Sequence, residues 1–138
     1  MNNAELQEKY YELHNITKSM KEMQKQVRLI DEQEAEIRSV MDGLDILAAT
    51  KEGTDLQVPI SPGIFVSAVL KSNSKLLVNV GANVTVEKDI ADTKALLDQR
   101  ILEMREAKVE VLTNLRELSA HAEELEQHVQ KLMEASGE

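Results

Sequence analysis

Residues 90–132 read IADTKALLDQRILEMREAKVEVLTNLRELSAHAEELEQHVQKL, and they contain the strongest pattern in this 138-residue chain. Apolar side chains recur at alternating steps of four and three residues, which is the a/d pattern of a coiled coil. The stripe, interrupted only by two lysines, consists of Ile90, Lys94, Leu97, Ile101, Met104, Lys108, Val111, Leu115, Leu118, Ala122, Leu125, Val129 and Leu132. Because such a stripe leaves apolar knobs in water, this helix needs a partner helix.

The partner lies in the same chain, where the same rhythm runs near the N-terminus. Its positions are Leu6, Lys9, Leu13, Ile16, Met20, Met23, Val27, Ile30, Glu34, Ile37, Met41, Leu44 and Ala48. The segment between the two helices is short, so they can pair only by folding back as an antiparallel hairpin. We predict helices over 5–49 and 88–134, with residues opposite each other when their numbers add up to about 138. This register predicts an ion pair between Glu34 and Lys108.

Between the helices, residues 56–87 change from a period of 3.5 to a period of 2, which is typical of strands. We expect strands over 56–58, 64–70, 75–80 and 84–86. The prolines and glycine of 59–63 should form one turn, and Gly81 to Asn83 another. The predicted fold class is therefore α+β: a long antiparallel α-helical coiled-coil hairpin with two β-hairpins inserted between its helices, all within one domain, 1–138.

Both faces of the second strand carry apolar residues, since Ile64, Val66 and Leu70 alternate with Phe65 and Val69. A four-stranded sheet of about 30 residues is too small to cover itself, and its edges leave backbone groups unpaired. We therefore expect strands from several chains to close into an oligomeric β-barrel body. The residues expected in this association are Ile64, Phe65, Val66, Val69, Leu70, Leu76, Val78, Val80, Val84 and Val86.

The composition narrows the possible functions. With 25 acidic and 16 basic residues, the formal charge of −9 disfavours nucleic acids and anionic membranes as partners. The charged start and the absence of a long apolar run indicate a soluble cytoplasmic protein, and the absence of cysteine fits a reducing compartment. No phosphate-binding loop or dinucleotide motif is present, so we expect no cofactor and no enzymatic activity. Of the three histidines, His14 faces outward, so a metal site is not expected.

One sequence block points to a known family. The stretch VPISPGIFVSAVLKSNSKLLVNVGANVTVEKD, residues 58–89, resembles prefoldin, and within it the archaeal alpha-type subunit. Its most specific parts are PGIFV, residues 62–66, and LLVNVGANVTVEK, residues 76–88. The order of elements matches over essentially the whole chain, and two β-hairpins favour the alpha type over the beta type.

This resemblance implies a function. Two alpha and four beta subunits would form a double β-barrel body from which six coiled-coil arms extend. Such a complex captures unfolded polypeptides between its arm tips and passes them to a group II chaperonin without using ATP. The chain would then be one subunit of a holdase chaperone.

If the chain works by contact, the free arm ends are the place to look for the contact residues. The distal turns combine stripe residues with apolar residues beside the stripe, and Met is well suited to irregular partners. The candidate residues for unfolded-protein binding are Leu6, Tyr10, Tyr11, Leu13, Ile16, Val129, Leu132 and Met133. Each contact is weak, because burying one aliphatic side chain gives about 1.5 to 3 kcal/mol, and several tips together would raise the avidity.

Two alternatives remain open. The tip residues can simply be stripe knobs, and surplus apolar residues also occur in mid-arm, at Leu96, Leu102, Val109 and Leu112. A different class of function is a structural coiled-coil adaptor, whose β oligomerisation body docks a fixed protein partner.

Overall fold

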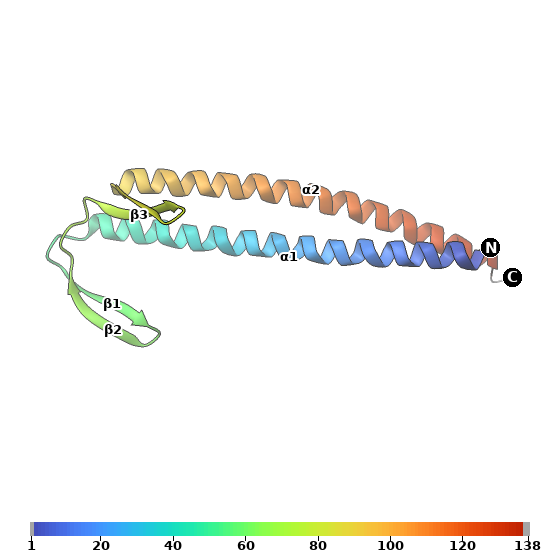
Figure 1. Cartoon of the computed structure of the whole chain (residues 1–138), viewed down its shortest axis with the longest axis horizontal. Coiled ribbons are helices and arrows are strands. Elements are labelled where there is room, and N and C mark those ends of the chain that lie inside the picture. Colours follow the sequence, from blue (N-terminus) through green and yellow to red (C-terminus); the bar gives the residue numbers. More distant parts are fainter. Residues whose placement is uncertain (1, 137–138) are drawn as a thin grey trace. The chain divides into compact units, whose positions relative to one another are not determined.

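The computed structural model describes residues 2–136 and contains two long helices that flank two β-hairpins (Figure 1). Helix α1 spans Asn2–Ala49 and helix α2 spans Ile90–Ser136. The strands are β1 (Asp55–Ser61), β2 (Ile64–Val69), β3 (Leu76–Gly81) and β4 (Val84–Lys88). The predicted order of helix, two hairpins and helix is confirmed. Helix α1 begins three residues earlier than predicted and continues through Gly43 to the predicted end at Ala49, whereas α2 begins and ends two residues later than predicted.

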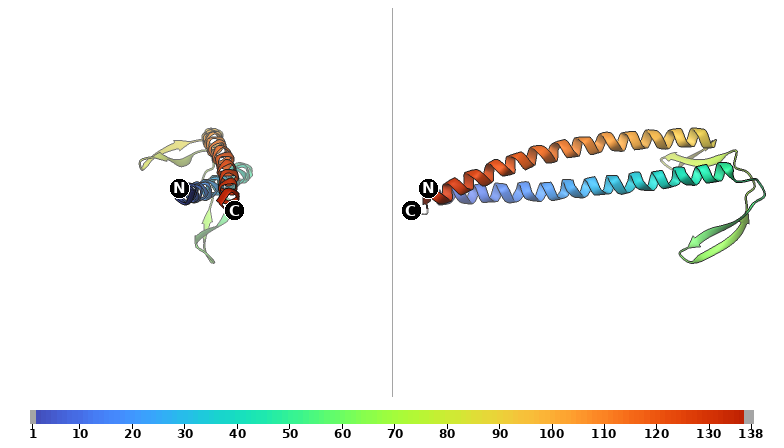
Figure 2. Two further views of the ribbon diagram at one scale, coloured as in Figure 1. Left: turned by 90° about the vertical axis from the view of Figure 1, so that its right-hand side faces the viewer. Right: turned by 180° about the vertical axis from the view of Figure 1, so that it is seen from behind.

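Contacts within the chain divide it into two units. Unit 1 comprises 1–33 and 103–138, and unit 2 comprises 34–102. The start of α1 and the end of α2 thus belong to the same unit, as an antiparallel hairpin requires. Within each unit, α1 and α2 run side by side, as Figure 1 and the right-hand view of Figure 2 show.

Burial follows the predicted stripe. Its positions are buried or half-buried along α2 from Ile90 to Leu132 and along α1 from Leu6 to Leu44. The most buried apolar side chains, with 9% or less of their surface exposed, are Ile16, Leu44, Leu97, Ile101, Leu125 and Val129. The last predicted position is wrong, because Ala48 is exposed and Leu47 is half-buried in its place.

Both lysines of the α2 stripe pair with an aspartate on α1. Within unit 1, Lys108 Nζ lies 2.6 Å from Asp31 Oδ1, and within unit 2, Lys94 donates to Asp45 Oδ1. Both pairs follow the predicted antiparallel register. Glu34 was the predicted partner of Lys108; within unit 1 Lys108 pairs with Asp31, and within unit 2 Glu34 contacts Arg38 at 3.6 Å. A long lysine side chain can lay its methylene groups along the stripe and still carry its charge out to an exposed carboxylate.

The two hairpins form two separate two-stranded sheets, β1–β2 and β3–β4, and not the single four-stranded sheet that we expected. The predicted turn over 59–63 is also wrong: Pro59 to Ser61 belong to β1, and Pro59 lies opposite Phe65. In a two-stranded sheet each strand has a free edge, so a proline can be accommodated there without breaking the ladder. The turn proper is Pro62-Gly63, with a positive φ of 82° at Gly63.

The second hairpin turns at Ala82 and Asn83, both of which have positive φ values, 51° and 62°. Two consecutive left-handed residues are typical of the type I′ turn that suits the right-handed twist of hairpin strands. Gly81 precedes them with a φ of 121°, and its amide donates to the Asn79 side chain at 2.9 Å. Each strand pair contains a register shift beside its turn, where Ile60 or Val80 is the extra residue.

Side chains define where both long helices meet the β region. Asp89 caps α2 through its Oδ1, which accepts a hydrogen bond from the Asp92 amide at 2.7 Å. At the end of α1, the side-chain amide of Asn73 donates to the carbonyls of Leu47 and Thr50 at 3.0 and 2.9 Å. Asn73 lies between β2 and β3, so this one residue ties the linker of the two hairpins to the C-terminus of α1 within unit 2.

The Asn73 contact generates a prediction. Asn73→Ala should lower the free energy of unfolding by about 1 to 3 kcal/mol, because two hydrogen bonds are lost and the Thr50 carbonyl loses its donor, while the Leu47 carbonyl keeps the Thr50 amide. Asn73→Asp should cost at least as much, since a carboxylate cannot donate to a carbonyl. Urea unfolding measures both, with Asn15→Asp on the exposed face of α1 as the control for added charge. If Asn73→Asp behaves like the control, the tether has no energetic role.

Lys94 should make the stability of the folded protein depend on pH. The hydrogen bond to Asp45, followed by the charge of that carboxylate, raises the pKa of Lys94 above its ordinary value of 10.5. A lysine whose pKa is higher in the folded state stabilises that state below the unfolded pKa, and this contribution is lost as the pH rises through the folded pKa.

We therefore expect wild type to lose more stability between about pH 10 and pH 12 than Lys94→Gln, while Lys94→Arg keeps its charge and its contribution. Thermal unfolding across that range tests this expectation. Parallel stability curves for wild type and Lys94→Gln would contradict it.

Candidate functional site

The distal part of unit 1 is built around three buried side chains. Ile16 of α1 and Leu125 and Val129 of α2 expose only 8%, 5% and 6% of their surfaces. Ile16 and Val129 were both predicted to bind unfolded proteins, but at this level of burial they serve to hold the helices together. Leu6, Leu13 and Leu132 are half-buried, so part of each side chain stays accessible.

Three further predicted residues are exposed, and two of them meet. Tyr10 is 46% exposed and Met133 is 49% exposed, and the Tyr10 hydroxyl lies 3.2 Å from the Met133 sulfur. Both occupy e positions beside the stripe, so the antiparallel register brings them onto one side of the helix pair. Tyr11 is 69% exposed, but at the next helix position it points about 100° further round, toward the outer face.

Two histidine–carboxylate contacts cross between the helices near the same end. His121 Nε2 lies 3.2 Å from Glu12 Oε1, and His128 Nε2 lies 3.7 Å from Glu5 Oε1. All four side chains are about half exposed, so these contacts lie at the rim of the buried stripe. They explain two histidines that the sequence left without a role.

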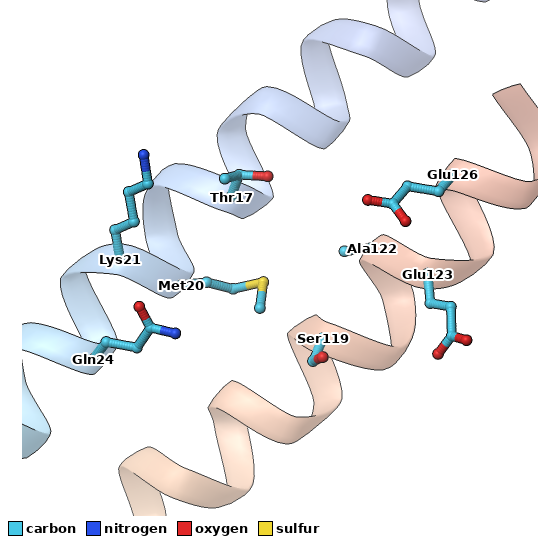
Figure 3. A pocket seen from close by; sticks show the side chains of 8 residues that line it. All are labelled: Thr17, Met20, Lys21, Gln24, Ser119, Ala122, Glu123 and Glu126. Carbon is cyan, nitrogen blue, oxygen red and sulfur yellow. The ribbon is translucent and has the colours of Figure 1, made fainter.

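Further along unit 1, small side chains leave a groove between the helices (Figure 3). Met20 of α1 points toward α2, where Ser119 and Ala122 present little volume to meet it. The groove is lined by Thr17, Met20, Lys21, Gln24, Ser119, Ala122, Glu123 and Glu126. Its floor is apolar and its rim carries both charge signs, so it shows no preference for one kind of ligand.

The β-hairpins expose most of the apolar residues predicted to associate. Ile64, Phe65, Val66, Val69, Val80 and Val84 are between 42% and 60% exposed, and Leu70, Leu76, Val78 and Val86 are half-buried. Three more apolar residues of the hairpins are exposed but were not among those predicted to associate: Val58, Ile60 and Leu77. Ile60 was assigned to a turn, and Leu77, which lies opposite Glu87, is on the other face of its strand from the predicted Leu76 and Val78.

Residues 2–136 contain no group of three or more His, Cys, Asp or Glu side chains placed to hold a metal ion. Within the same range, neither α1 nor α2 has a stretch apolar and long enough to cross a membrane.

Comparison with known proteins agrees with this architecture. A family model described as "Prefoldin subunit" matches residues 16–135. The prefoldin alpha subunit of Methanococcus aeolicus is 25% identical over 133 residues, which are 96% of this chain and 90% of that protein. The alpha subunit of Nitrosopumilus maritimus is 30% identical over 100 residues, 72% of this chain and 68% of that protein.

A solved structure shares the fold. The chain superimposes on filamentous PFD from Methanocaldococcus jannaschii, determined by cryo-EM, with a TM-score of 0.77. The match covers 82% of this chain and 93% of that chain at 19% sequence identity.

Substitutions of buried and of exposed residues at the distal end should differ in their effect on stability. Ile16→Ala should lower stability by roughly 2 to 4 kcal/mol, because it opens a cavity in the buried stripe. The double variant Tyr10→Ser/Met133→Ser should change stability by less than about 1 kcal/mol, since both side chains are half exposed. Chemical denaturation compares the two. A large loss in the double variant would show that Tyr10 and Met133 are structural.

Proposed function

Because this chain belongs to the prefoldin subunit family and is similar to archaeal alpha subunits, we propose that it acts as one subunit of an ATP-independent holdase chaperone. In this proposal the β-hairpins assemble with other subunits, and the distal ends of the helical hairpins capture unfolded polypeptides. The captured chain is then released to a group II chaperonin.

The observation that carries the proposal is the exposed pair Tyr10 and Met133 beside half-buried Leu6 and Leu132. Apolar side chains that remain accessible next to a well-packed core offer adaptable surface to a partner without fixed structure. Met fits irregular partners because its side chain is unbranched and polarizable. Capture of this kind needs no bound nucleotide, which agrees with the absence of a phosphate-binding loop from the sequence.

Binding by one tip would be weak and reversible. Covering a half-exposed side chain gives less than the 1.5 to 3 kcal/mol of a fully buried one, so a few contacts per tip give only modest affinity. Several tips that engage the same flexible chain multiply this affinity through effective concentration. Weak individual contacts then allow stepwise release to a second chaperone.

Assembly through the hairpins is supported by their exposed apolar residues and by their free edges. Each two-stranded sheet is too small to be stable by itself, and each has apolar residues such as Val58 and Val66 directly opposite each other on one face. We propose that beta-type subunits cover these faces, in a complex of two alpha and four beta subunits with a β-barrel body. The mass of the purified protein with and without a beta-type subunit tests this step.

The tip assignment makes a direct prediction for chaperone activity. The assembled complex with Tyr10→Ser/Met133→Ser should suppress aggregation of a denatured test protein several-fold less well than wild type. Leu29→Ser is the matched control, because Leu29 is equally exposed, at 48%, but lies about five helical turns along α1 from Tyr10. Equal loss in both variants would contradict a specific role for the tip.

A second readout separates the holdase from the structural adaptor. Removing about ten residues from both ends of the chain should abolish suppression of aggregation while the complex keeps its mass. If activity is unaltered and a fixed partner is retained through the β region, the adaptor is the better description.

A further inference from the structure

The outer face of α1 in unit 1 carries a continuous aromatic and basic stripe. Its residues recur at steps of three and four, so they lie on one side of the helix. They are Tyr11, His14, Lys18, Lys21, Lys25 and Arg28, and all six are exposed. The stripe runs for about 26 Å along the helix at 1.5 Å per residue. It occupies b and f positions, the side directed away from the buried a/d stripe, and Figure 3 shows Lys21 pointing away from α2.

The four cations of this stripe have no partner within the described chain. Other cations do pair with carboxylates, among them Lys9, Lys108 and the two distal histidines of unit 1. Glu22 lies four residues after Lys18 and three before Lys25, yet it bridges to neither. In a chain of net charge −9, four unpaired cations in a row are a local reversal of the overall charge.

We propose that this stripe is a docking surface for an acidic segment of a partner protein, distinct from the tip that holds unfolded chains. The argument is charge complementarity. A helical or extended segment with carboxylates at intervals of three and four residues would place one negative charge near each of the four cations. Tyr11, 69% exposed at the distal end of the stripe, offers an aromatic face to an apolar residue of the same segment.

The net negative charge of the chain disfavours nucleic acids and anionic membranes as partners of this stripe. Nucleic acids and anionic membranes respond to the field of the whole protein, which is negative. A short acidic peptide senses mainly the nearest charges, because exposed charges further apart than about 8 to 10 Å are screened at physiological salt. A single face of one helix also suits a single segment better than a wide phosphate surface.

Binding of a labelled acidic peptide tests the proposal. The probe is a helical peptide with glutamates at intervals of three and four on one face, and its matched control has glutamine at those positions. Fluorescence anisotropy with the assembled complex should show binding of the glutamate peptide that weakens as salt is added. The triple variant Lys18→Gln/Lys21→Gln/Lys25→Gln should bind about tenfold more weakly, since each exposed pair contributes a few-fold.

The control variant has the same net charge. Lys51→Gln/Lys71→Gln/Lys75→Gln neutralises three exposed lysines outside the stripe and should bind the probe as wild type does. Equal affinity of the two triple variants, or no binding by wild type at low salt, would overturn the proposal. Stripe-dependent binding of an RNA oligonucleotide or of anionic vesicles in preference to the peptide would overturn the choice of a protein partner.

Suppression of aggregation is measured in parallel. The stripe variant should retain it, because the tip contacts are intact. Loss of peptide binding with intact suppression separates this surface from the holdase site, so either proposal can fail without the other. Loss of both activities in the stripe variant, with the complex at its normal mass, would show that the stripe is part of the capture surface and not a separate docking site.

Discussion

Burial of one apolar stripe against another within the same chain is the interaction on which the rest of the structure depends. An isolated helix would leave its apolar stripe in water, and most helical stability in proteins comes from packing such a face. Because the partner helix belongs to the same chain, the pairing is antiparallel. It brings the start of α1 and the end of α2 together in unit 1. That constraint places Tyr10 near Met133 and Glu12 near His121, although more than 100 residues separate each pair in the sequence.

Polar residues inside the stripe set the register at a small cost in stability. Lys94 and Lys108 each reach an aspartate that lies beside the α1 stripe and not within it. A pair in the buried stripe would have to lose its water, whereas these carboxylates remain more than half exposed. Shifting one helix by a turn would separate both pairs together, so two weak contacts act jointly against the wrong alignment.

Much of this architecture follows from sequence period alone, because heptads and strand alternation report which side of each residue is buried. The period could not reveal which of several neighbouring residues makes a given contact, or where a strand ends. The stripe pattern led to Glu34 as the partner of Lys108 and did not indicate Asp31, which a flexible lysine reaches from the same position. Pro59 stayed in a strand, because the rule against proline applies to central strands and both sheets have only edges.

Sequence period likewise could not show which of the predicted contact residues at the distal end stay accessible. Ile16 and Val129 share the chemistry of the tip residues, and only the paired helices show that they are buried while Tyr10 and Met133 are accessible. Exposed apolar residues are the costly part of such a design, because each one favours aggregation of the chain itself.

Tyr10 and Met133 are only half exposed, which limits that cost at the distal end, and the charged outer faces of the helices keep the neighbouring surface hydrated. The arm can therefore combine an adaptable apolar end with outer faces that are free to recognise charge, and the two kinds of recognition need not compete. On this view Tyr11 belongs with the outer basic face more than with the tip, because its position on the helix, and not its hydrophobicity, decides which partner it can meet.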